Sequence, residues 1–76
     1  MATTGQARLK DVWAMLDACA PGWRPKPYTH NYCIMYGKRT YPSFHDRVDV
    51  GHIKRMIKHL GIDMDCARQH LKVLQG

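Results

Sequence analysis

Two histidines in the middle of the chain carry the side chains best suited to chemistry. Imidazole exchanges a proton near neutral pH, so it can act as a general acid or a general base. His30 precedes a strand-like run and His45 follows another. Such a ring can take the proton of an RNA 2′-hydroxyl or give one to the leaving 5′-oxygen. His30 is the leading catalytic candidate and His45 an accessory one, while the alternative for each is an ordinary loop histidine.

Cleavage of a phosphodiester also needs positive charge, and the chain is rich in it. Twelve Lys and Arg face six Asp and Glu, which gives a net charge of +6. This excess indicates an anionic partner such as RNA, DNA, an acidic protein or a membrane surface, although a merely soluble basic surface is the alternative. We expect cations on the turn at Gly37 and on the predicted helix between Asp49 and Gly61 to bind the phosphates. These residues are Lys38, Arg39, Lys54, Arg55 and Lys58. With imidazole moving protons and these cations stabilising charge, the step needs no metal and no small-molecule cofactor.

The cysteines give no sign of a cross-link or a metal site. Cys19, Cys33 and Cys66 are odd in number and show no paired spacing, which argues against a disulfide framework. No CxxC pair occurs, and the set His30, Cys33, His45 and His52 is irregularly spaced, so no zinc site is expected. We predict that all three cysteines pack in the core, and that His70 is a plain surface residue.

Two helical patterns flank a strand-like middle in these 76 residues, which predict one domain over 1–76. Apolar residues at helical spacing predict a helix over residues 4–19 and another between Asp49 and Gly61, with a last helix capped by Asp63. Strands are expected over 23–28, 31–36 and 39–41, with Pro42 ending the pairing and a loop over 43–49. The fold class is therefore α+β, in the order α-β-β-β-α-α. A three-stranded antiparallel sheet should be covered by helices on one face.

The compartment follows from what the chain lacks. Residues 1–6 show no secretory signal, and no apolar run approaches the length of a membrane helix. We therefore expect a cytoplasmic protein with no membrane partner.

The order of these elements resembles that of HicA mRNA interferases, the toxin half of bacterial HicA–HicB pairs. The matching stretches cover most of residues 9–71 and include Thr29-His30-Asn31-Tyr32 and Gly37-Lys38-Arg39-Thr40-Tyr41-Pro42. The family has a Gly-Ser-His or Gly-Thr-His step before its second strand, and its histidine is needed for RNA cleavage. Here Thr29 and His30 match, while Tyr28 stands in place of the glycine and narrows the approach of the RNA backbone.

The resemblance implies a fold like that of double-stranded-RNA-binding domains and a function as the toxin of a toxin–antitoxin pair. It implies an endoribonuclease that acts on mRNA through His30, with Thr29 beside it at the RNA. It also implies a HicB-like antitoxin that covers His30, and such a partner should be acidic where it makes contact. The rival hypotheses are a non-catalytic RNA-binding module of the same fold and a protein-interaction domain.

Overall fold

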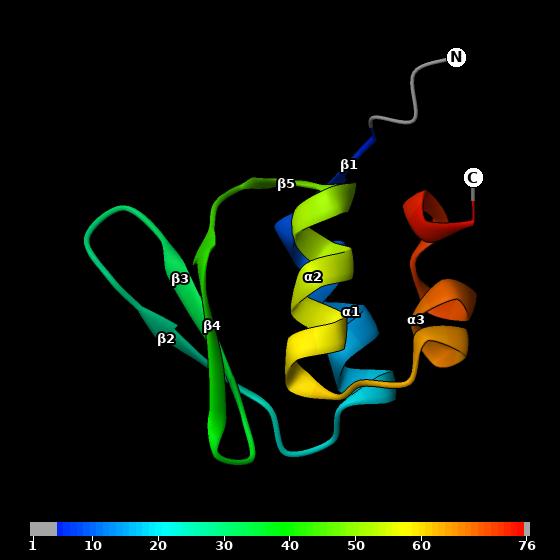
Figure 1. Cartoon of the computed structure of the whole chain (residues 1–76). Coiled ribbons are helices and arrows are strands. Elements are labelled where there is room, and N and C mark those ends of the chain that lie inside the picture. The colour runs from blue at the N-terminus through cyan, green and yellow to red at the C-terminus, as the bar shows by residue number, and fades with distance from the viewer. Residues whose placement is uncertain (1–4, 76) are drawn as a thin grey trace.

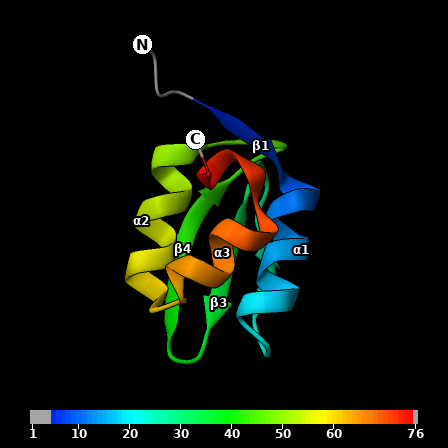
Figure 2. The ribbon, with the colours of Figure 1, turned by 90° about the vertical axis from the view of Figure 1, so that its right-hand side faces the viewer.

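A three-stranded antiparallel sheet carries a layer of helices on one face (Figure 1). The computed structural model describes residues 5–75. Seen from the helical side, α3 lies between α1 and α2 with the strands behind (Figure 2). The predicted α+β class and three-stranded sheet are confirmed. The elements in chain order are β1 (Gln6–Arg8), α1 (Leu9–Cys19), β2 (Arg24–Pro27), β3 (Tyr32–Tyr36), β4 (Arg39–Phe44), β5 (Arg47–Asp49), α2 (Val50–Leu60), α3 (Met64–His70) and a final 3-10 turn (Lys72–Leu74).

The core lies between the sheet and the helices. The apolar stripe of α1 buries Val12 and Leu16, while α2 buries its own stripe of four residues, Ile53, Met56, Ile57 and Leu60. Ile34 of β3 and Phe44 of β4 meet them from the sheet, and both are fully buried. Each such side chain contributes about 1.5–3 kcal/mol when it leaves water. The two helical stripes therefore form as the spacing predicts.

The ends of α2 and α3 also follow their sequence signals. Gly61 takes the left-handed conformation, with φ of 74°, and closes α2. Asp63 caps α3 by accepting a hydrogen bond from the backbone N–H of Asp65. Asp49 precedes α2 as predicted, but its carboxylate accepts a hydrogen bond from the side-chain amide of Gln6 instead of capping the helix.

A second, two-stranded sheet was not predicted. Gln6–Arg8 pairs with Arg47–Asp49 in antiparallel register, so the first helix begins at Leu9, whereas we predicted a start at residue 4. The predicted start, Thr4, lies outside the described residues. Three-residue strands are too short to show the alternation that identifies a strand in a sequence. One of them, Arg47–Asp49, lies within residues 43–49, which were predicted to form a loop.

The prediction that Pro42 ends the strand is wrong, because β4 runs on to Phe44. Tyr41 pairs with Ile34 and Phe44 with Tyr32, so Pro42 and Ser43 lie opposite the single residue between them. This is a β-bulge, and Ser43 adopts a positive φ of 73° within it. The bulge accommodates the proline on an edge strand and lets pairing resume beyond it.

The prediction of unpaired cysteines is wrong for two of the three. Cys19 at the end of α1 and Cys66 on α3 form a disulfide, with 5.8 Å between their Cα atoms. They are 47 residues apart in the chain, and only the packing of α3 beside α1 brings them together. Cys33 is a free thiol, buried as predicted.

None of the helices formed by residues 5–75 has both the length and the apolar character needed to cross a membrane.

Candidate functional site

The tip of the β2–β3 hairpin presents His30. Tyr28 donates a backbone hydrogen bond to the carbonyl oxygen of Asn31 over 2.8 Å, which leaves Thr29 and His30 as a two-residue turn. Both turn residues are exposed. The Thr29-His30 turn therefore projects His30 into solvent. The hydrogen bond between Tyr28 and Asn31 fixes the conformation of that turn.

The end of β4 brings His45 to the same place. Tyr32 at the start of β3 pairs with Phe44 at the end of β4, so the residues just outside this pair lie at one end of the sheet. Phe44 is fully buried and anchors the strand end, whereas the next residue, His45, is exposed. His30 and His45 thus reach one location from two separate elements.

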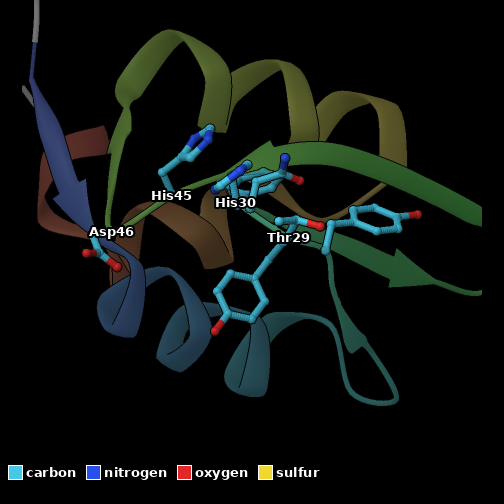
Figure 3. A pocket seen from close by; sticks show the side chains of 8 residues that line it. Thr29, His30, His45 and Asp46 are labelled. Atoms are coloured by element: carbon cyan, nitrogen blue, oxygen red, sulfur yellow. The ribbon is translucent and has the colours of Figure 1, made fainter.

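An open pocket of about 300 Å³ lies at this end of the sheet. Figure 3 shows His30 and His45 there, with Asp46 further along toward β1. The lining residues are Tyr28, Thr29, His30, Asn31, Tyr32, Phe44, His45 and Asp46. The pocket includes His30 and His45, the two predicted acid–base residues, together with Thr29, which was predicted to bind RNA, and Tyr28, which was predicted to stand beside its path. Because the two imidazoles are exposed, they can exchange protons with solvent and with a bound molecule.

The five predicted phosphate-binding cations are absent from the eight residues that line this pocket. Lys38 lies in a separate hollow at the β3–β4 turn, and the guanidinium of Arg39 donates to the carbonyl oxygen of His59 over 2.8 Å. The remaining three are exposed on α2: Lys54, Arg55 and Lys58. The Gly37 turn and α2 therefore contribute no cation to the lining of this pocket.

Three other cations lie beside the pocket. Arg8, Lys10 and Arg47 line an adjoining hollow of about 490 Å³, and Asp46 is part of both hollows. Arg8 stands directly opposite Arg47 in the pairing of β1 with β5. Like charges in that position destabilise a sheet, so the arrangement favours an anion between or near them. No pattern in the sequence identifies these residues, because their proximity depends on the unpredicted two-stranded sheet.

Aromatic rings border the pocket as well. Tyr28 is 51% exposed and Tyr32 is 38% exposed. The ammonium of Lys26 lies 5.7 Å from the centre of the Tyr28 ring. Exposed rings with a neighbouring cation suit the stacking of an unpaired base. Tyr36, in contrast, is half-buried and packs against the core.

Comparison of the chain with protein-family models, with curated protein sequences and with solved structures finds no match. The assignment of the site therefore depends on its geometry and chemistry.

Proposed function

We propose that the chain is an endoribonuclease that cleaves single-stranded mRNA by acid–base catalysis. The observation that carries the proposal is the presence of His30 and His45 in one open pocket. Two imidazoles that face the same space can serve as the base and the acid of one reaction.

The reaction would proceed by transfer within the RNA. One imidazole takes the proton of a 2′-hydroxyl, whose oxygen attacks the adjacent phosphorus. The bond from phosphorus to the 5′-oxygen then breaks, and the second imidazole protonates that oxygen. The products are a 2′,3′-cyclic phosphate and a free 5′-hydroxyl, so every atom is accounted for without a metal.

The negative charge that develops on the phosphate needs fixed cations nearby. Arg8, Lys10 and Arg47 line the hollow next to the pocket and are well placed to hold the phosphates of a strand that enters it. Tyr28 and Tyr32 can stack on its bases, which are available only in unpaired RNA.

The fold and the Thr29-His30 turn also support a proposal about the family to which the chain belongs. An α-β-β-β-α core with its helices on one face of the sheet is what a relative of double-stranded-RNA-binding domains would show. The Thr29-His30 turn is the HicA-like feature. In that case the chain is the toxin of a cytoplasmic pair, and an acidic HicB-like antitoxin inhibits it by covering His30.

The test is cleavage of a fluorescent single-stranded RNA by the purified chain, with and without a chelator. We expect cleavage that is insensitive to chelation, and a loss of about 10²-fold or more in rate for His30→Ala and for His45→Ala. RNA affinity should change little in either variant. His59→Ala, which alters a histidine outside the pocket, is the matched control and should cleave at the wild-type rate.

A DNA strand of the same sequence separates this proposal from its rival. Because DNA lacks the 2′-hydroxyl, it should bind and stay intact. If the wild-type chain binds RNA but never cuts it, a non-catalytic RNA-binding module is the better interpretation. Failure to bind RNA at low salt would leave the protein-interaction hypothesis.

A further inference from the structure

The ends of α1 and α3 bring together two sulfur atoms and an imidazole that take no part in the pocket. Nδ1 of His70 lies 3.7 Å from Sγ of Cys19 and 3.9 Å from Sγ of Cys66. All three atoms lie within 4.8 Å of one another. Cys66 and His70 are four residues apart on α3, so they share one face of that helix.

These distances are close to those of a metal site. Tetrahedral zinc binds sulfur at about 2.3 Å and nitrogen at about 2.0 Å, which requires nitrogen-to-sulfur separations of about 3.5 Å and a sulfur-to-sulfur separation of about 3.8 Å. Both separations from the imidazole are within a few tenths of an ångström of this requirement. Only the sulfur-to-sulfur separation differs, because the disulfide closes it. Rotation of the two cysteine side chains can open it while the Cα atoms stay 5.8 Å apart.

The setting of the three residues also suits an ion. His70 is exposed and the two cysteines are half-buried, so the cluster is accessible from solvent. Nδ1 of His70 also lies 3.0 Å from the carbonyl oxygen of Cys66, to which it donates when it carries the proton. A metal would replace that proton.

We propose that the reduced chain binds a thiophilic divalent cation, such as zinc, through Cys19, Cys66 and His70. Binding displaces the protons of the two thiols and leaves the fourth coordination position open to solvent, as in sites with three protein ligands. The metal and the disulfide are then alternative links between α1 and α3. None of the three ligands lines the pocket, so the proposal does not depend on the ribonuclease assignment.

The test is a titration of cobalt(II) into the chain after reduction by a phosphine under anaerobic conditions. We expect one equivalent to bind per chain, with a near-ultraviolet thiolate charge-transfer band and the visible bands of tetrahedral cobalt, and zinc should displace it. Cys66→Ser should weaken binding by about 100-fold or more and His70→Ala by about tenfold or more. Cys33→Ser, which changes the free cysteine, is the matched control and should bind like the wild type.

Circular dichroism of each sample completes the test. Zinc should raise the melting temperature of the reduced chain. It should have no such effect on the oxidised chain, in which Cys19 and Cys66 are bonded to each other and offer no thiolate. The proposal is overturned if the reduced chain shows no charge-transfer band, or if Cys66→Ser binds as tightly as the wild type. It is equally overturned if reduction unfolds the chain and zinc does not restore its helical signal.

Discussion

His52 on the first turn of α2 directs Nε2 at the carbonyl oxygen of Pro42, 3.0 Å away. The same ring packs against Phe44 with 4.8 Å between ring centres, and against Tyr41 with 5.1 Å. One side chain thus holds α2 to the bulged part of β4, directly before His45. The hydrogen bond forms when Nε2 carries the proton and donates to the carbonyl oxygen.

Replacing His52 with alanine should therefore loosen this attachment. We expect the free energy of unfolding to fall by about 1–2 kcal/mol in His52→Ala, through the lost hydrogen bond and ring contacts. Urea denaturation measures the change. Lys54→Ala, an exposed substitution on the same helix, should stay within about 0.5 kcal/mol of the wild type. Equal stability of the two variants would show that the ring contributes nothing.

Ser43 offers a second test of the same region, because its positive φ of 73° is strained for any residue with a side chain. Ser43→Gly should unfold at the same or a higher temperature than the wild type. Ser43→Val should lose about 1–2 kcal/mol, because a β-branched residue fits this conformation poorly. In a cleavage assay, the valine variant should also be slower, since the bulge sets the position of His45. A valine variant as stable as the glycine variant would contradict the described backbone.

The cations beside the pocket can be distinguished from those on α2 by paired charge changes. A double variant, Arg8→Gln with Arg47→Gln, should bind single-stranded RNA more weakly. It should also reduce the magnitude of the slope of log affinity against log salt by about 1.4, since each phosphate contact to a single strand contributes about 0.7. Lys54→Gln with Lys58→Gln removes the same charge from exposed positions of α2 and should have the smaller effect. Fluorescence anisotropy at several salt concentrations makes the comparison. A larger effect from the α2 pair would indicate that the phosphates bind to the α2 cations predicted from the sequence.

The disulfide should contribute strongly to stability in the metal-free chain. It joins residues 47 apart, and closing a loop of that length stabilises a fold by about 4 kcal/mol in the chain-entropy account. Reduction in the presence of a chelator should therefore lower the urea midpoint of the wild type. A Cys19→Ser, Cys66→Ser double variant should resemble the reduced chain and be insensitive to reductant. If the reductant shifts both proteins equally, the effect has another origin.

The features that the sequence predicted are those set by neighbours along the chain. The stripe of Val12 and Leu16, the left-handed Gly61 and the cap at Asp63 each depend on residues within one or two helical turns, so spacing alone identifies them. Pro25 and Pro27 likewise indicate an edge strand, and β2 lies at an edge of the sheet, where its prolines disrupt no pairing.

The features that the sequence did not predict depend on contacts between distant segments. The pairing of Arg8 with Arg47 joins two three-residue strands, and the bulge at Ser43 arises only when β4 aligns with β3. The approach of His70 to Cys19 needs the whole helical layer. At the pocket, Thr29 and His30 were identifiable by residue type, but only the pairing of Tyr32 with Phe44 explains why His45 joins them.

Both outer strands of the three-stranded sheet carry proline, at Pro25 and Pro27 on β2 and at Pro42 on β4. A foreign strand that tried to extend the sheet would meet missing amide donors on either side. Copies of the chain are thereby discouraged from joining into larger sheets, even when they are crowded. Any macromolecule that binds here must recognise side chains, because neither edge offers a full ladder of backbone donors.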